Sequence, residues 1–390
     1  MLSGLYLHVP FCSAICPYCD FAVLTGGHEA RARFADRLIA EAALWREDAP
    51  AFGPFDTVYF GGGTPTALTP DDLGRILEAV RADFGVSGIS SGPGDAWIFL
   101  EANPEDVTPE SLAAWRRLGV RTLSLGVQSF DAKALAFLGR RHGPEQARRS
   151  VLLAGESGFD TVSLDLIYGL PGETSEDWRR TLEQAVAVAP DHLSCYQLTI
   201  HEGTPFGFRK GRGQLAELPE PDQAERFLFT HTFLRDAGYP GYEVSNFARS
   251  PAHRSRHNQK YWYHVPYLGL GPSAHSYLGN RRWWNERKLK PYQAKVDAGE
   301  RPVADGEELT REDMALEALM LGLRTADGLD LGRLRERYGV DLEARNPGLI
   351  DRLADEGLLL VVSGEGKERA VRPTLEGWAV ADSLARSFEV

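Results

Sequence analysis

The sequence has few cysteines, fewer basic than acidic side chains, and no long apolar run. Only 4 of its 390 residues are cysteine, which excludes a disulfide-rich extracellular scaffold. The formal net charge of −12 disfavours broad binding to nucleic acid or anionic membranes, because both need a basic surface. No apolar stretch approaches the roughly 18 residues of a membrane span, and the N-terminus lacks the pattern of a secretory signal. We therefore expect a cytoplasmic protein with no transmembrane segment and no nucleic-acid partner.

The cysteines are unevenly placed. Three of them share one short loop at C-x₃-C-x₂-C spacing: Cys12, Cys16 and Cys19. Soft thiolate ligands select zinc, Cu(I) or an iron–sulfur cluster. A structural zinc site needs a fourth protein ligand, and the candidates are His8, Asp20 and Cys195. A four-iron cluster held by three thiolates would instead keep one iron open to a further ligand. Zinc, and a disulfide with a spare thiol, remain the alternatives at this point.

Strand and helix signals alternate along the first 240 residues. Short apolar stretches of strand length lie at 4–9, 55–60, 97–101, 121–125, 161–167 and 192–198. Residues at helical spacing follow each of them, and Thr69-Pro70 has the N-cap and first-turn proline of a helix start. Strands that alternate with helices pair in parallel through right-handed crossovers. Because a closed barrel has eight such units, we expect an incomplete (βα)6 TIM-like barrel of α/β class.

The remaining chain has a different composition. Residues 241–304 are rich in aromatic side chains and are predicted to be a linker segment. From 305 to 390, helices are expected at 311–323, 331–338, 349–356 and from 374, with strands at 358–362 and 370–371. This order is typical of a winged-helix-like α+β domain, and its acidic composition favours a cap or interaction surface over DNA binding. The Gly/Ser-rich stretch 85–94 is expected to be a solvent loop.

Chemically competent residues cluster where the predicted strands end. Gly61-Gly62-Gly63 follows the second strand, Glu101 ends the third, Gln128 follows the fourth and Asp165 lies in the fifth. Active sites of α/β barrels gather at this edge. Glycines allow close backbone approach to a ligand, and the carboxylates could accept hydrogen bonds from hydroxyl or amino groups. Taken singly, each has an ordinary alternative as a plain loop or a helix cap.

The N-terminal motif resembles a known superfamily. Tyr6-x-His8-x-Pro10-Phe11-Cys12-x₃-Cys16-x-Tyr18-Cys19, followed by 61–65, is similar to the radical S-adenosylmethionine (SAM) proteins. The similarity continues through 101–104, 126–130 and 165–171, and is greatest to the branch that contains coproporphyrinogen III oxidases and HemW-like heme chaperones. It implies a [4Fe–4S] cluster on the three cysteines, with SAM on the open iron. The residues implied to hold SAM are Tyr6, Tyr18, Gly62, Gly63, Thr64, Glu101, Gln128, Arg140 and Asp165.

A second motif favours one group of proteins within that branch. Residues 257–262 read His-Asn-Gln-Lys-Tyr-Trp, which matches the H-N-x-x-Y-W pattern of the heme chaperones. The resemblance implies heme binding by His257, Asn258, Tyr261 and Trp262, since a neutral imidazole can ligate heme iron. His253, His264 and His275 are rival ligands. The alternative for the aromatic side chains is that they pack between the barrel and the C-terminal domain.

Two functions follow from the resemblance. The first is a heme chaperone that binds heme and delivers it to apoproteins, membrane-associated ones included. The second is oxidative decarboxylation of coproporphyrinogen III, an oxygen-independent step of porphyrin synthesis. The oxidase pattern has another cysteine two positions after the third one, where this chain has Phe21. That departure and the H-N-x-x-Y-W match favour the chaperone. Productive SAM cleavage, catalytic residues and a homodimer are left open.

Overall fold

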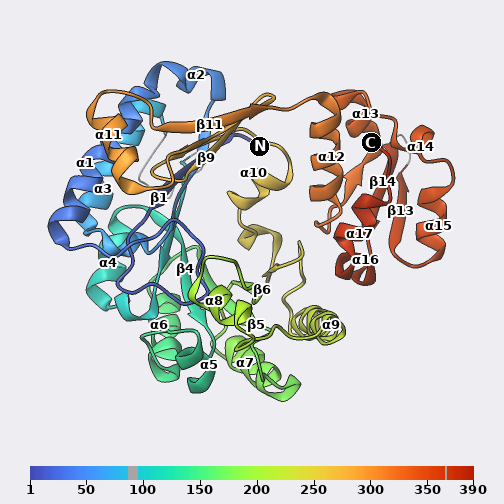
Figure 1. Cartoon of the computed structure of the whole chain (residues 1–390), viewed down its shortest axis with the longest axis horizontal. Helices are drawn as coiled ribbons and strands as arrows, with labels where there is room; N and C mark the ends of the chain where they lie inside the picture. Colours follow the sequence, from blue (N-terminus) through green and yellow to red (C-terminus); the bar gives the residue numbers. More distant parts are fainter. Residues whose placement is uncertain (87–94, 365–366) are drawn as a thin grey trace. The chain divides into compact units, whose positions relative to one another are not determined.

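The computed structural model describes residues 1–86, 95–364 and 367–390, which form two compact units. The first comprises Met1–Leu218 and Val265–Glu307, and the second comprises Pro219–His264 and Glu308–Val390 (Figure 1). The predicted segments 1–240, 241–304 and 305–390 divide the chain differently, because the middle segment is shared between the units. Most of the predicted loop 85–94 lies outside the described residues.

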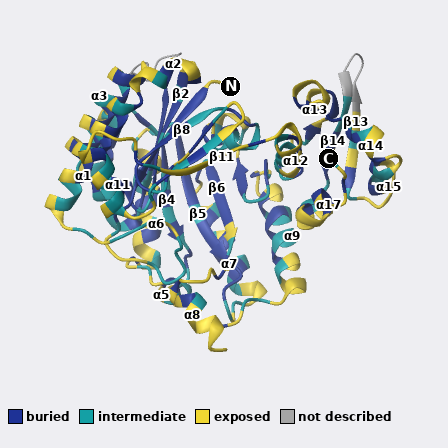
Figure 2. Cartoon of the chain, turned by 45° about the horizontal axis from the view of Figure 1, so that its top comes forward, coloured by how far each residue is buried: buried dark blue, intermediate teal, exposed yellow. Residues whose placement is uncertain are grey.

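A mostly parallel sheet is the centre of the first unit. Its strands run in the order β11-β10-β9-β8-β1-β2-β3-β4-β5-β6, and β1 to β6 pair in parallel with their sequence neighbours. The bounds are β1 Ser3–Val9, β2 Phe55–Gly62, β3 Trp97–Ala102, β4 Val120–Gln128, β5 Thr161–Tyr168 and β6 His192–Gln197. Figure 2 shows that these strands are buried over most of their length, which explains their continuous apolar sequences. The predicted α/β barrel architecture is confirmed.

Helices connect these strands and cover the sheet (Figure 1). They are α1 His28–Leu44, α2 Ala49–Phe52, α3 Pro70–Phe84, α4 Pro109–Arg117, α5 Ala132–Phe137, α6 Pro144–Glu156, α7 Ser175–Ala187 and α8 Pro205–Gly211. Local sequence sets their starts: Thr69 Oγ1 accepts a hydrogen bond from the Asp72 backbone at 3.1 Å at the beginning of α3. The hydroxyls of Thr108 and Thr174 cap α4 and α7 in the same way.

The sheet continues past β1 with strands that the sequence analysis missed. β8, Tyr267–Leu270, pairs in parallel with β1, so β1 is an interior strand. β9 His275–Leu278, β10 Arg281–Asn285 and β11 Val303–Glu308 extend that side, and α11 spans Leu289–Asp297. These strands are short, and their aromatic residues were assigned to a linker. Residues 265–307 are thus an integral part of the first unit.

The second unit combines helices with a small antiparallel sheet of order β12-β14-β13. Its earlier segment contains α9 Glu220–Asp236, β7 Asn246–Ala248 and α10 Asn258–Trp262. The later segment contains α12 Arg311–Gly322, β12 Leu329–Asp330, α13 Leu331–Tyr338, α14 Leu342–Arg345, α15 Leu349–Asp355, β13 Leu359–Gly364, β14 Lys367–Pro373, α16 Leu375–Ala379 and α17 Ala381–Arg386. Buried residues such as Leu319, Leu334 and Val371 form its core. Among the described helices, none has the length and apolarity to cross a membrane.

Candidate functional site

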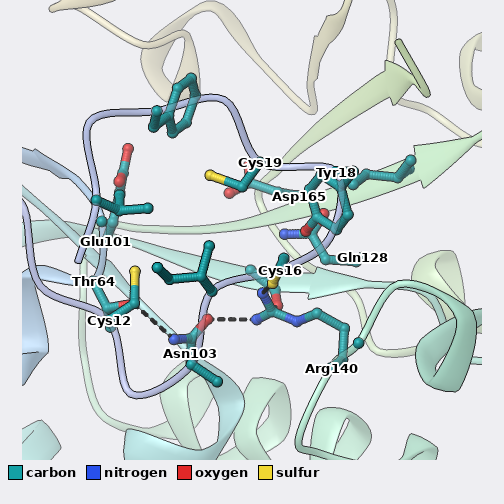
Figure 3. A pocket seen from close by; sticks show the side chains of 18 of the residues that line it. Cys12, Cys16, Tyr18, Cys19, Thr64, Glu101, Asn103, Gln128, Arg140 and Asp165 are labelled. Carbon is teal, nitrogen blue, oxygen red and sulfur yellow. Dashed lines mark hydrogen bonds between the residues drawn. The ribbon is translucent and has the colours of Figure 1, made fainter. Parts of the chain in front are cut away.

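One cavity of about 440 Å³ lies where the strands β1 to β6 end. The structure brings together almost all of the residues predicted to hold the cluster and SAM. Those that line the cavity are Cys12, Cys16, Tyr18, Cys19, Gly62, Gly63, Thr64, Glu101, Gln128, Arg140 and Asp165. Figure 3 shows the three sulfur atoms around one space, with Glu101 on one side and Arg140 on the other. Tyr6 is the exception: it does not line the cavity, and its hydroxyl lies 3.2 Å from His8 Nδ1.

The cysteine loop leaves β1 and is held by its own backbone. Cys12 donates its N–H to Leu24 O at 3.0 Å, and Cys19 donates to Cys16 O at 3.1 Å. All four cysteines of the chain are free thiols. Burial raises the pKa of the Cys12 thiol and raises that of Cys19 to about 11. Both thiols are therefore protonated near neutral pH, and a metal centre must displace their protons when it binds.

A zinc site closed by a fourth protein ligand finds little support in this geometry. His8 lies with Nε2 3.0 Å from Ala22 O and Nδ1 3.2 Å from the Tyr6 hydroxyl, so both ring nitrogens face protein groups. Cys195 is buried in β6 and does not line the cavity. Asp20 does line it, but it would add a hard oxygen to three soft sulfurs. Three thiolates with an open position suit an iron–sulfur cluster better.

The turn after β2 requires glycine. Gly62 has a φ of +109°, and a Cβ atom built there would lie 2.6 Å from the His8 ring. A Cβ at Gly63 would lie 2.7 Å from Phe11 O. The Gly62 N–H donates to Glu101 Oε2 at 3.2 Å. This backbone therefore passes directly along the cavity, where it can approach a bound ligand closely.

Two half-buried carboxylates face the cavity. Glu101 accepts a hydrogen bond from the Tyr59 hydroxyl at 2.7 Å, and Asp165 accepts one from Ser124 Oγ at 3.4 Å. Burial raises the pKa of Glu101 to about 7 and that of Asp165 to about 6. A cationic ligand in the cavity would favour their ionised forms. The pair therefore suits a ligand that has a positive charge and hydroxyl groups.

A hydrogen-bond network joins Arg140, which lies across the cavity from Glu101, to the cysteine loop. Arg140 donates from Nη1 to Cys16 Sγ at 3.5 Å, and from Nη2 to Asn103 Oδ1. Asn103 donates in turn to Thr64 Oγ1 at 3.0 Å, and Thr64 donates to Cys12 Sγ at 3.6 Å. The Arg140 Nε–H is buried and has no acceptor among the described residues. Arg140 thus has hydrogen-bonding capacity left for a carboxylate.

Asn103 is a site residue that the sequence analysis did not select. It follows directly on β3, within the stretch 101–104 that contributes to the family resemblance. Its position after a strand end was the available signal. Gln128, which was selected, ends β4 with a φ of +66°. A non-glycine residue held there costs on the order of 1–3 kcal/mol, so the surrounding fold must enforce this placement.

A [4Fe–4S] cluster with SAM fits this site. The site offers three thiols, which would leave one iron of the cluster open, together with a glycine turn and polar groups at the ends of parallel strands. The arrangement defines the class as radical SAM proteins. The model of the Radical SAM superfamily matches residues 6–185, and the model of the HemN C-terminal domain matches residues 309–380. Membership of this superfamily implies both the cluster and SAM.

The relatives narrow the class further. The chain is 39% identical to a heme chaperone HemW of Mycobacterium tuberculosis, over 93% of this chain and 92% of the relative. It is 31% identical to the heme chaperone HemW of Bacillus subtilis, over 99% of each chain. The structure of the Escherichia coli coproporphyrinogen III oxidase HemN superposes with a TM-score of 0.80 at 27% identity, over 99% of this chain and 89% of the oxidase. The chain therefore belongs to the HemW family of radical SAM proteins, as its motifs indicated.

The H-N-x-x-Y-W residues lie in the second unit, at α10. His257 is only 1% exposed, and its Nε2 lies 2.9 Å from the Tyr261 hydroxyl. Burial, together with the charge of Lys260, lowers the pKa of His257 to about 3, so the imidazole is neutral. His264 is also buried, whereas His275 is exposed on β9 in the first unit beside Trp284. Of the four histidine candidates, two are thus buried, while His253 is half-buried and His275 is exposed.

Proposed function

We propose that this protein is a heme chaperone: it binds heme and delivers it to apoproteins, and its scaffold is that of a radical SAM protein. The observation that supports this most strongly is the similarity to curated heme chaperones along nearly the whole chain. The H-N-x-x-Y-W motif agrees with it. Membrane-associated apoproteins are included among the recipients. We place the protein in the reducing cytoplasm, where free thiols persist, and a homodimer is the assembly to test first.

We propose the cavity of the first unit as the site of the cluster and SAM. We assign the cluster to Cys12, Cys16 and Cys19. Gly62 and Gly63 would give SAM close access to the backbone, Glu101 and Asp165 would accept hydrogen bonds from its hydroxyl and amino groups, and Arg140 would bind its carboxylate. Tyr18, Thr64 and Gln128 form further parts of the cavity wall. Tyr6 does not line the cavity, and its hydroxyl would support the site by holding the His8 ring. When bound, the cluster and SAM supply one-electron chemistry that side chains lack.

The heme motif has a neutral imidazole that could ligate iron. His257 would have to exchange its bond with Tyr261 for the metal, since its Nε2 lies 2.9 Å from that hydroxyl. Asn258, Tyr261 and Trp262 would then form the surroundings of the ligand. Because His257 is buried, heme ligation by this residue implies a local rearrangement of α10.

The alternative function is that of the coproporphyrinogen III oxidase, to which the fold is similar. Phe21 lies at the cavity, 65% exposed, where the oxidase pattern has a cysteine. The decisive experiment is anaerobic reconstitution of the cluster, followed by parallel assays of heme binding and of coproporphyrinogen decarboxylation. We expect heme binding without turnover. Turnover without heme binding would contradict the proposal.

A variant series addresses the iron ligand. His257→Ala should change the position of the heme Soret band if His257 ligates iron. His253→Ala, in the preceding one-turn helix Pro251–His253, tests the first of the rival ligands. His264→Ala and His275→Ala complete the series. An unaltered spectrum in His257→Ala, with a shift in one of the others, would move the ligand to that residue.

A further inference from the structure

The second unit contains a cavity of its own, of about 450 Å³, within the range of small-molecule and cofactor sites. It lies between the end of α10, the helices α12 and α13, and the strands β12 and β14. Trp262, the last residue of the H-N-x-x-Y-W motif, is part of its wall. The cavity therefore connects that motif to the C-terminal segment 308–390.

The wall is basic in a chain that is acidic as a whole. Three arginines line the cavity, namely Arg333 and Arg337 on α13 and Arg372 on β14, against two aspartates. Both aspartates already have partners. Asp327 accepts hydrogen bonds from Arg254 at 3.1 Å and from the Tyr263 hydroxyl at 2.6 Å, and Asp330 accepts one from the Arg333 backbone N–H at 2.9 Å.

The three arginines differ in the partners of their guanidinium groups. Arg337 donates to His264 O at 2.9 Å and to Tyr263 O at 3.3 Å, so it supports the wall itself. Arg333 and Arg372 form no ion pair within the described ranges, and both are exposed at the cavity. The stem of Arg372 packs on Gly328, where an added Cβ would lie 2.7 Å from Arg372 Cγ. Two guanidinium groups are therefore available to an anionic ligand.

The rest of the wall is aromatic and apolar. Trp262, Tyr338, Leu329 and Leu334 line the cavity. The indole N–H of Trp262 is buried and has no acceptor in the part of the chain that the structure describes. An orphaned buried donor is costly, and it favours a ligand that covers the ring and offers an acceptor. Flat aromatic side chains pack well against a flat ring system.

We propose that this cavity binds a planar macrocycle with carboxylate side chains: Trp262 packs against the ring, and Arg333 and Arg372 bind the carboxylates. This inference rests on the proposed function, in which the macrocycle is heme. The two arginines would then bind the propionates of heme. Arginine forms paired hydrogen bonds with carboxylates. The site also gives the C-terminal segment a role in binding, which the H-N-x-x-Y-W motif alone does not imply.

The test uses the full-length, cluster-loaded protein under anaerobic conditions. Heme and its dimethyl ester, which has the same ring without ionisable carboxylates, are titrated separately and followed by Soret absorbance. The test variant is Arg333→Ala/Arg372→Ala. Its matched control is Arg335→Ala/Arg352→Ala, which removes two exposed arginines of the same unit that do not line the cavity. Thermal unfolding checks that both variants remain folded.

The wild-type protein should bind heme at least about tenfold more tightly than the dimethyl ester, which corresponds to roughly 1.4 kcal/mol. The test variant should lose that discrimination because its heme affinity falls to that of the ester, while the control keeps it. Trp262→Leu should weaken binding of both ligands.

Three results would overturn the proposal. They are a test variant with wild-type heme affinity, an equal loss of affinity for heme and ester in that variant, and a wild-type protein that does not distinguish the two. A wild-type protein that binds neither ligand would instead contradict the proposed heme-chaperone function, so the two failures are distinguishable.

Discussion

Glu41 shows how a single buried side chain joins distant parts of the first unit. This α1 residue is fully buried, and its carboxylate accepts three hydrogen bonds from the segment 265–307. The donors are the Gly271 N–H at 2.7 Å, Asn285 Nδ2 at 2.6 Å and the Tyr292 hydroxyl at 2.6 Å. The strands that extend the sheet past β1 are therefore attached to the first helix of the chain.

Glu41→Ala should destabilise the first unit strongly. The substitution removes the acceptor of the Gly271 N–H and of the Tyr292 hydroxyl, whereas Asn285 Nδ2 keeps Gly271 O at 2.9 Å. An unsatisfied buried donor costs about 1–3 kcal/mol, so we expect a loss of at least about 2 kcal/mol. Urea unfolding followed by tryptophan fluorescence measures it. Glu29→Ala is the control, since Glu29 lies on the same helix but is exposed. A loss below about 1 kcal/mol would contradict the role given to Glu41.

The same residue predicts a pH dependence. Burial raises the pKa of Glu41 to about 7 from its ordinary value of 4.5, although three hydrogen bonds oppose the shift. The folded state therefore holds this proton more tightly than the unfolded chain does. The resulting stability, on the order of 3 kcal/mol, is present in full below about pH 4.5 and is lost as the pH rises through about 7.

Glu41→Gln isolates this contribution. Glutamine cannot ionise, so the wild-type protein should lose more stability than the variant between pH 5 and pH 8. The variant should be less stable than the wild type at pH 5, because its amide NH₂ group faces one of the donors that bond to Glu41. The difference in stability between the two proteins should become smaller toward pH 8. Urea midpoints measured across this range test the prediction, and a constant gap would contradict it.

At the scale of elements, the site depends on how β1 and β2 end next to each other. Gly62, in the last position of β2, pairs with Val9, the last residue of β1, and lies against the ring of His8. The cysteine loop leaves β1 one residue after this pair. A change at Gly62 therefore affects the backbone of the site without touching a proposed cluster ligand.

Gly62→Ala should weaken SAM binding at least about tenfold and destabilise the protein by roughly 1–3 kcal/mol. The reasons are its φ of +109° and a Cβ 2.6 Å from the His8 ring. Equilibrium dialysis of the reconstituted protein and thermal unfolding measure the two effects. Gly27→Ala is the control, because its Cβ meets nothing within 4 Å. Wild-type affinity in Gly62→Ala would show that the backbone is free to adjust.

At the scale of the whole molecule, the chain enters the second unit twice. The segment 219–264 pairs with 308–390 through backbone bonds, for example Val244 N–H to Arg324 O at 3.1 Å and Ala326 N–H to Tyr242 O at 2.9 Å. The His264 ring lies 2.9 Å from the Tyr338 hydroxyl. The H-N-x-x-Y-W motif is therefore supported by residues that lie far along the sequence.

A chain that ends at residue 307 should keep the cluster and lose heme binding. The cavity proposed for the cluster lies wholly in the first unit, whereas 219–264 would lose its packing partners and become sensitive to protease. Cluster absorbance, heme titration and limited proteolysis provide the readouts. Protease resistance of 219–264 in the shortened chain would contradict the prediction.

Local sequence patterns predicted the parallel strands, their helices and the edge at which the site lies. Continuous apolar runs and N-caps such as Thr69 are local signals, and the cysteine spacing places all three thiols in one loop whatever the tertiary fold. Because parallel strands end together, the sequence predicts one edge for the cysteine loop, Gly62, Gly63, Glu101, Gln128 and Asp165. The family resemblance added Tyr18, Thr64 and Arg140 to this group. The cavity includes all of them.

The other features depend on residues that come together only in the folded chain. Asn103 gains its place through partners 37 and 39 positions away, and Glu41 through partners more than 200 positions away. The strands β8 to β10 have only four or five residues, and β11 is mostly exposed and charged. They form because β8 pairs with β1 and the others add to the sheet beyond it. The division of 241–304 between two units, and the basic cavity at Trp262, likewise depend on contacts between distant segments. Local propensity has no information on such contacts, because they form only when the chain folds back on itself.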